Sequence, residues 1–146
     1  MISARPCCAK RARKASCSVH LLHRDATRLE DIPSNHFDWY IATFLFCVMS
    51  DALQPLALAE LARVLKPAGR FKLIEMRFSE QPRLRWRQKL FAPFVEAVYG
   101  ARFDRRTLEH LEDQPQLRVT RTSFLKADTY LLIEGLKRGE APDLPG

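Results

Sequence analysis

The sequence predicts an α/β fold in which a mostly parallel sheet is covered by helices on both faces. Residues Phe37–Phe46 are rich in aromatic and β-branched side chains with little polar alternation, as in a strand buried on both faces. A helical pattern follows and must stop at Pro67, and a second apolar strand is predicted at Phe71–Met76. A strand, a helix and a strand joined by tight links indicate a right-handed crossover connection between parallel strands.

The crossover helix is predicted to begin after Ser50 or Asp51, either of which suits an N-cap, with Pro55 tolerated near the first turn. Apolar residues at spacings of mostly three and four form the stripe that we expect to face the sheet. These residues are Leu53, Leu56, Leu58, Leu61, Val64 and Leu65. Gly69 supplies a permissive backbone for the turn into the next strand.

The flanking regions complete the predicted order of elements. Val19–Arg24 alternates weakly, which predicts a short strand. Pro93 is expected to kink or break the helix in which it lies. The later elements are a helix at Arg83–Tyr99, a short helix at Arg105–Glu112, and two strands at Leu117–Leu125 and Tyr130–Leu136. Residues 126–128 are expected to join these two strands as an antiparallel hairpin.

Length and composition favour one globular domain, because the chain has 146 residues of which 47% are hydrophobic. No apolar run reaches the roughly 18 residues that a membrane-spanning helix needs. We expect three parts: a basic head or helix at residues 1–18, an α/β domain at 19–137, and a flexible tail at 138–146. The expected location is the cytoplasm, with peripheral membrane contact as an alternative.

The head carries most of the net charge of +7, since residues 1–24 contain six Lys or Arg side chains and no acid. Three interpretations remain open: a solvated basic helix or tail, a mitochondrial presequence, and a patch for nucleic acid or an anionic membrane. A secretory signal is disfavoured because the head has no continuous apolar core.

Neither a metal site nor a nucleophilic catalytic set can be derived from the residue pattern. The four cysteines form no C-x-x-C pair, and no second ligand pair lies at a matching distance from His20 and His23. We therefore expect no metal, and the catalytic residues stay undefined.

A longer motif carries a family resemblance. The segment FDWYIATFLFCVMSDALQPLALAELARVLKPAGRFKLIE resembles the central part of class I S-adenosylmethionine-dependent methyltransferases, the type 11 group that includes ubiquinone/menaquinone and phospholipid methyltransferases. The resemblance covers about residues 19–137. It implies a Rossmann-like fold, S-adenosylmethionine as cofactor, and transfer of a methyl group to a small acceptor, with lipids or quinones as the favoured class.

Two departures from the family pattern stand out. Ala68-Gly69 replaces the usual Gly-Gly, which we expect to be mild if Ala68 keeps a negative φ. The glycine-rich loop that lies against the methionine part of the cofactor is absent, because the five glycines include none before Gly69. By this resemblance the chain begins near the end of the family's second strand, and we expect it to be weakly active or inactive alone.

The missing strands have a structural consequence. The family's sheet order is 3-2-1-4-5-7-6, so the strand at Phe37–Phe46 should keep one long, unpaired, hydrophobic edge. Such an edge favours self-association unless the amino-terminal strand or another chain covers it.

Candidate cofactor contacts follow from the resemblance and from position. Asp25 and Ala26 match the family position that contacts the adenine, although Asp25 could equally cap the following turn. Thr43, Phe44 and Leu45 lie where a strand ends, at the carboxyl edge where ligands bind in open α/β sheets, with core packing as the alternative. Asp51 is interpreted as a helix cap, and Glu75 as the polar end of a strand.

The helix at Arg83–Tyr99 is basic at its start and apolar later. It is either a cover for the sheet or a segment that contacts an anionic, lipid-like substrate or membrane surface. The residues proposed for that contact are Arg83, Arg85, Trp86, Arg87, Phe91 and Phe94. The alternative functions are a non-catalytic methyltransferase-like remnant or interaction module and, less favoured, a nucleic-acid binder; we expect no nucleic-acid partner.

Overall fold

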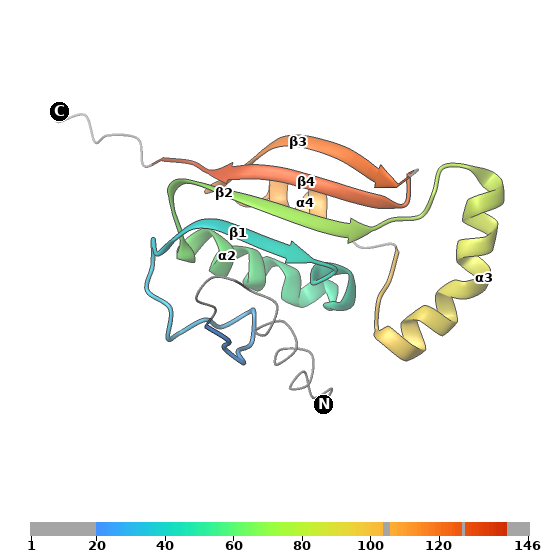
Figure 1. Ribbon diagram of the computed structural model, residues 1–146, viewed down its shortest axis with the longest axis horizontal. Helices are drawn as coiled ribbons and strands as arrows, with labels where there is room; N and C mark the ends of the chain where they lie inside the picture. The colour runs from blue at the N-terminus through green and yellow to red at the C-terminus, as the bar shows by residue number, and fades with distance from the viewer. Residues whose placement is uncertain (1–19, 104–105, 127, 140–146) are drawn as a thin grey trace.

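The computed structural model describes residues 20–103, 106–126 and 128–139, which form a four-stranded sheet with helices (Figure 1). The strands are β1 (Phe37–Thr43), β2 (Leu65–Met76), β3 (Leu117–Lys126) and β4 (Tyr130–Lys137). The helices are α2 (Gln54–Val64), α3 (Pro82–Tyr99) and α4 (Thr107–Glu112), and two short 3-10 turns, η1 (Phe46–Val48) and η2 (Asp51–Leu53), precede α2. No helix among these residues is long and apolar enough to cross a membrane.

The strand order is β1-β2-β4-β3. The β1–β2 pair is parallel and the β2–β4 and β3–β4 pairs are antiparallel, so three strands run one way and only β4 opposes them. The mostly parallel sheet, the β1–α2–β2 crossover and the carboxyl-terminal hairpin are therefore confirmed. Within the described residues β1 pairs only with β2, which leaves the unpaired edge that the sequence predicts.

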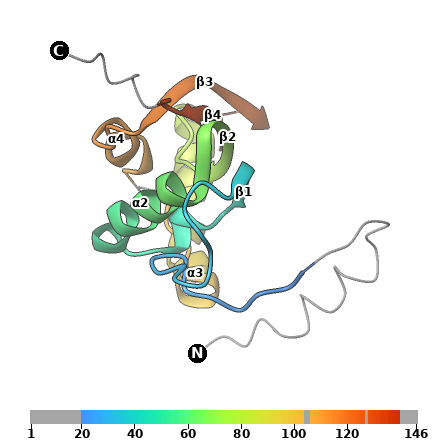
Figure 2. The ribbon, with the colours of Figure 1, turned by 90° about the vertical axis from the view of Figure 1, so that its left-hand side faces the viewer.

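One face of the sheet holds the core, because α2 and α4 both lie against it (Figure 2). Leu58, Leu61, Phe71, Leu73 and Ile133 have no exposed surface. The buried residues of α2 recur at helical spacing: Gln54, Ala57, Leu58, Leu61, Ala62 and Val64. A stripe of this kind is what fixes an amphipathic helix on a sheet.

The sequence predicts helices on both faces of the sheet, but no described helix covers the opposite face. Trp39 and Ile41 on β1 are 48% and 68% exposed, and no helix in the described part of the chain lies over them. Arg70 and Lys72 of β2 lie over the Trp39 ring, with 5.6 Å and 5.8 Å from cation to ring centroid. Lys72 also pairs with Glu134 of β4 at 2.6 Å, so this face is a charged surface with an aromatic residue at its edge.

Three sequence predictions on the amino-terminal side of the crossover are wrong in detail. The strand expected up to Phe46 ends at Thr43, because Phe44 adopts a left-handed φ of 56° and turns the chain. Leu53 and Leu56 are 43% and 53% exposed, because α2 begins only at Gln54 and its buried stripe excludes them. Residues 20–24 form no strand, and no described strand lies beside β1 to pair with them; Val19 lies outside the described residues.

The link between α2 and β2 is tighter than predicted. β2 already begins at Leu65, and residues 66–69 bulge out between the pairs Phe37–Leu65 and Trp39–Arg70. Ala68 has a φ of 62°, so the expectation of a negative φ is wrong. The bulge needs a left-handed residue where the family has glycine, and an alanine there is strained.

Helix α3 stands at the end of the sheet rather than against a face (Figure 1). It continues through Pro93 as one helix, and its direction changes toward its carboxyl-terminal end (Figure 1). The predicted kink is therefore present and the break is not. Gly100 then ends the helix in the left-handed conformation, with a φ of 67°.

Candidate functional site

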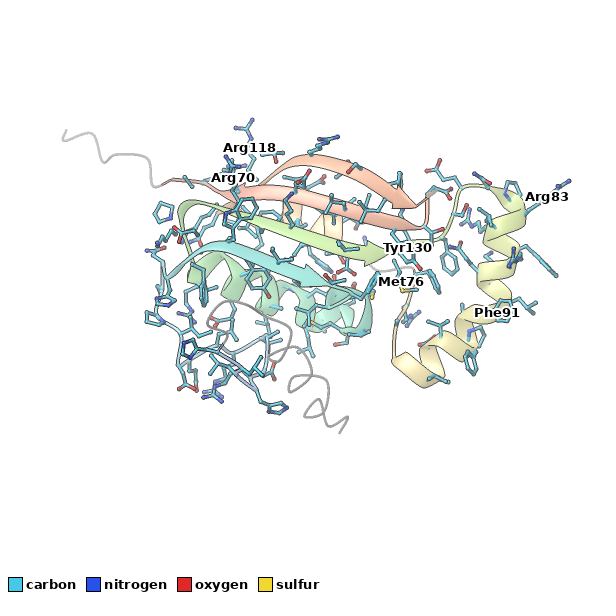
Figure 3. The ribbon with its side chains drawn as sticks, in the orientation of Figure 1. Arg70, Met76, Arg83, Phe91, Arg118 and Tyr130 are labelled. Atoms are coloured by element: carbon cyan, nitrogen blue, oxygen red, sulfur yellow. The ribbon has the colours of Figure 1, made fainter. Side chains whose placement is uncertain are left out.

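A cleft of about 570 Å³ opens where β2 ends, between that strand, the first turn of α4 and the start of α3. Its walls combine apolar and charged side chains. Its lining residues include Glu75, Phe78, Arg85, Phe103, Arg106 and Leu131. Met76 and Tyr130 pair across β2 and β4 at this same edge of the sheet (Figure 3). Carboxyl edges of this kind are the usual ligand sites of open α/β sheets.

Glu75 is the most unusual residue of the cleft. The side chain is only 4% exposed, because alternation along β2 points it to the helix-covered face together with Phe71 and Leu73. Its Oε1 accepts a hydrogen bond from the Phe46 backbone N–H at 3.2 Å, whereas its Oε2 is buried without a hydrogen-bond partner. Burial raises the pKa of Glu75 to about 7, against a usual value of 4.5.

The Cys47 thiol lies beside this carboxyl. Burial, and secondarily the charge of Glu75, raises the pKa of the thiol to about 11. The thiol donates to the Phe44 carbonyl at 3.5 Å. It is therefore a neutral, packed group at physiological pH rather than a nucleophile.

A buried polar chain fixes the floor of the site. The Thr107 hydroxyl donates to Gln54 Oε1 at 3.2 Å, and Gln54 Nε2 donates to the Phe46 carbonyl at 3.0 Å. The Phe46 N–H then reaches Glu75. These contacts join α4, α2, η1 and β2, so the position of the Glu75 carboxyl is set by four elements at once.

The rim of the cleft carries charges of both signs. Arg77, Arg85 and Arg106 line it together with Glu80 and Glu109. Arg106 and Glu109 form an ion pair at 2.5 Å, which lies at the surface. The rim therefore has little net charge, and Glu75 is the deeply buried ionisable group among these.

Asp25 and Ala26 lie away from this cleft, in the segment before β1. Asp25 is exposed, and its Oδ1 accepts from both the N–H and the hydroxyl of Thr27, at 2.9 Å and 2.8 Å. These hydrogen bonds lower the pKa of Asp25. The carboxylate thus caps its own turn, the alternative that the sequence left open.

Thr43, Phe44 and Leu45 lie at the carboxyl end of β1, as predicted. Phe44 donates its N–H to the Ile74 carbonyl at 2.8 Å, and its ring lies 5.6 Å from that of Tyr130. Thr43 and Phe44 are exposed, and Leu45 packs partly against the core. These three residues therefore lie at the carboxyl edge of the sheet, at the end of β1.

The proposed contact residues of α3 are exposed. Trp86, Phe91 and Phe94 are 67%, 56% and 62% exposed, and Arg83, Arg85 and Arg87 are exposed as well. Arg83 extends away from the sheet (Figure 3), whereas Phe91 lines a shallow hollow together with Phe103 and Thr129. The interpretation of α3 as a simple cover for the sheet is wrong, because its large apolar side chains contact solvent.

Glu75 is more than the polar strand end that its position in the sequence predicts, because its carboxyl is buried. The signal was present: Phe71, Leu73 and Glu75 share one face of a strand, and that face is the one an amphipathic helix must cover. Gln54 and Thr107 carried no comparable signal, because their partners come from distant parts of the chain.

The described residues supply only part of a cofactor site. The carboxyl ends of β1 and β2 fit a ligand edge, but the chain has no glycine before Gly69 and Asp25 is engaged in its own turn. In the part of the chain that the structure describes, no group of three His, Cys, Asp or Glu side chains could hold a metal ion.

Comparison with known proteins gives consistent results. A family model for a methyltransferase domain matches residues 4–69. Among curated proteins, none matches the sequence. A solved S-adenosylmethionine-dependent methyltransferase from Methanosarcina mazei is 17% identical, with 90% of this chain and 76% of that chain covered and a TM-score of 0.61.

Two further solved structures share the fold. The mitomycin 7-O-methyltransferase is 21% identical, with 92% of this chain and 38% of that chain covered and a TM-score of 0.65. The cyclase SpnF is 18% identical, with 93% and 61% covered and a TM-score of 0.62. This chain thus spans less than two thirds of each of these two proteins. Because the fold also carries a cyclase, the fold by itself does not determine the reaction.

The sheet, the crossover and the cleft at its carboxyl edge agree with the methyltransferase match and with the shared fold. A methyltransferase-domain model thus matches part of the chain, and the described residues form part of the fold that solved S-adenosylmethionine-dependent methyltransferases share.

Proposed function

We propose that this protein takes part in S-adenosylmethionine-dependent methylation of a small lipophilic acceptor and that its described residues form the acceptor side of the site. The family supports methyl transfer in general. The observation that carries the acceptor side is the cleft at the end of β2, whose walls combine apolar and charged side chains around a buried carboxyl. Positioning of the acceptor supplies much of the rate in such transfers, and no covalent intermediate is needed.

Cofactor affinity tests this division of roles. Each missing charge-assisted hydrogen bond weakens binding by about 1.5–3 kcal/mol, so losing two or three costs on the order of a thousandfold. We expect calorimetric titration of the 146-residue chain with S-adenosylmethionine to give a dissociation constant of about millimolar or weaker and negligible turnover.

Fusing a glycine-loop segment from a relative should restore cofactor binding. In that fusion, Asp25→Ala should weaken binding if Asp25 contacts the adenine, and should leave it unchanged if the carboxylate only caps its turn. Micromolar affinity in the unmodified chain would contradict the role given to the glycine loop. A fusion that binds the cofactor but methylates nothing would favour the non-catalytic interaction module.

Helix α3 supports a lipophilic acceptor presented at an anionic surface. Its amino-terminal end is anchored: Gln88 accepts from the Ser79 N–H at 2.7 Å, and Asp128 accepts from the Ser79 hydroxyl at 2.8 Å. Beyond this anchor a row of large apolar side chains repeats every four residues along one exposed side. The row consists of Trp86, Leu90, Phe94 and Val98.

The first half of the same helix contains four basic residues, and the whole helix contains a single acid, Glu96. An apolar row beside a basic segment is the pattern of helices that lie in the interface of anionic membranes. We expect the chain to bind vesicles of phosphatidylserine and phosphatidylcholine, and to bind them less as salt screens the charges.

Two variants test α3 in a sedimentation assay with these vesicles. Phe94→Ser should reduce binding by removing apolar contact, whereas Leu125→Ser, which removes a similarly exposed residue of β3, should not. Equal binding by both variants, or equal binding to pure phosphatidylcholine, would leave α3 as a cap over the acceptor and would remove the membrane from the proposal.

A further inference from the structure

We propose that the cleft at the end of β2 binds a flat, largely apolar molecule through one hydroxyl or N–H group that donates a hydrogen bond to Glu75 Oε2. The existence of this binding site does not depend on the proposed function. Only the identification of the bound molecule as the methyl acceptor rests on it.

The unused acceptor is the first observation. Glu75 is 4% exposed, its Oε1 is satisfied by the Phe46 N–H, and its Oε2 has no partner among the described residues. Buried polar atoms nearly always have a hydrogen-bond partner, because leaving one unpaired is unfavourable. A donor group from a bound molecule would satisfy this oxygen.

The second observation is the volume and the lining of the cleft, to which Glu75 contributes. A volume of about 570 Å³ is typical of sites for small organic molecules. Phe78 and Phe103 both line it and stack on each other with ring centroids 5.1 Å apart. Leu108, Leu131 and Ile133 complete the apolar part of the wall. A flat apolar body with a single polar donor fits this combination of walls and buried acceptor.

The third observation concerns protonation. With burial raising its pKa to about 7, Glu75 changes charge near physiological pH. A carboxylate accepts a stronger hydrogen bond than a carboxylic acid does, and it can also take the proton of the bound donor. Binding of a hydroxyl compound should therefore strengthen as the pH rises through about 7.

Other charged groups line the same cleft. They are Arg77 and Glu80 after β2, Arg85 on α3, and Arg106 and Glu109 at α4, with the Cys47 thiol beside the carboxyl. None of these acids is buried as Glu75 is. Glu80, an exposed carboxylate on the rim, is therefore the matched control.

The test uses the full chain and two probes, 2-naphthol and its methyl ether 2-methoxynaphthalene, which differ in the donor hydroxyl. Binding is followed by NMR below about pH 6 and above about pH 8, on either side of the Glu75 pKa. We expect 2-naphthol to bind about tenfold tighter than the ether at the higher pH, and this preference to shrink at the lower pH. In Glu75→Gln the pH dependence should disappear, whereas in Glu80→Gln it should persist.

A second measurement does not depend on a variant that folds. The carboxyl ¹³C signal of Glu75 in the unaltered chain should titrate near pH 7, and 2-naphthol should shift that titration to lower pH. Equal binding of the two probes, no binding of either, or an unshifted Glu75 titration would overturn the proposal. Methylation assays are read separately: if probe binding is pH-dependent but the glycine-loop fusion transfers no methyl group, the site stands and only its identification with the methyl acceptor falls.

Discussion

The two faces of the sheet have opposite surroundings although they share the same four strands. On the face that α2 and α4 cover, Leu61, Leu73 and Ile133 have no exposed surface. On the other face Ile41 is 68% exposed and Trp39 is 48% exposed, with the cations of Arg70 and Lys72 over its ring. The described elements therefore complete one face of the sheet and leave the other face, with the edge of β1, open.

This difference shows where stability and function are located. The covered face supplies apolar burial, and it also holds Glu75, a buried acid that opposes stability once it is ionised. Residues that lower stability without a packing reason are candidates for function. Among the described residues of the open face no ionisable side chain is buried as Glu75 is, so these side chains should tolerate substitution.

The largest expected effect is a loss of stability on the covered face. Leu61→Ala should lower the free energy of unfolding by about 2–5 kcal/mol, because it leaves a cavity between α2 and the sheet. Ile41→Ala on the open face should change it by about 0.5 kcal/mol or less. Urea denaturation followed by circular dichroism measures both, and similar losses would mean that the open face is covered in solution.

The next effect is the pH dependence that Glu75 imposes. Its pKa is about 7 in the folded chain and near 4.5 when unfolded, so the unfolded chain loses this proton first as the pH rises. The contribution of Glu75 to stability is fully present below about pH 4.5 and is lost as the pH rises to about 7. Over this range the free energy of unfolding should fall by about 3 kcal/mol. Glu75→Gln should remove this fall.

Thermal unfolding across this pH range checks the prediction. Above about pH 7 the Glu75→Gln variant should be more stable than the original chain, because an amide carries no buried charge. Glu80→Gln should keep the original profile. An unchanged profile in Glu75→Gln would mean that the carboxyl is solvated, which would also weaken the proposed binding site.

The same two faces show what a sequence alone can predict. The crossover was predictable because Pro67 and the apolar periodicity are local signals, and the hairpin because its two strands are adjacent in the chain. The exposure of Leu56 was predictable too, because at 100° per residue it lies on the side of α2 opposite Leu58 and the buried stripe. The polar chain from Thr107 to Glu75 contains hydrogen bonds between residues 53 and 29 positions apart, which no local pattern encodes.

A smaller effect is expected at the bulge that begins β2. Ala68→Gly should raise stability by about 0.5–1 kcal/mol, since the φ of 62° strains alanine more than it does glycine. Gly69→Ala is the matched control and should destabilise, because its Cβ would lie 2.8 Å from the Lys66 carbonyl oxygen. A loss of stability in Ala68→Gly, measured by urea denaturation, would show that the bulge has a different conformation.

The last prediction compares the two edges of the sheet and concerns association more than stability. The β3 edge is interrupted by two irregularities and carries Arg118 and Arg121, features that discourage pairing between chains. The β1 edge instead presents Trp39 and Ile41 beside unpaired backbone.

We expect concentration-dependent self-association of the full chain in sedimentation velocity. Ile41→Lys should reduce it while leaving the unfolding free energy almost unchanged, because a lysine on an edge strand resists burial against a second strand. Thr122→Lys, the matched change on β3, should have no effect on association. If both variants associate like the original chain, the contact does not use the β1 edge; if the original chain is monomeric at all concentrations tested, the open edge is covered within the chain itself.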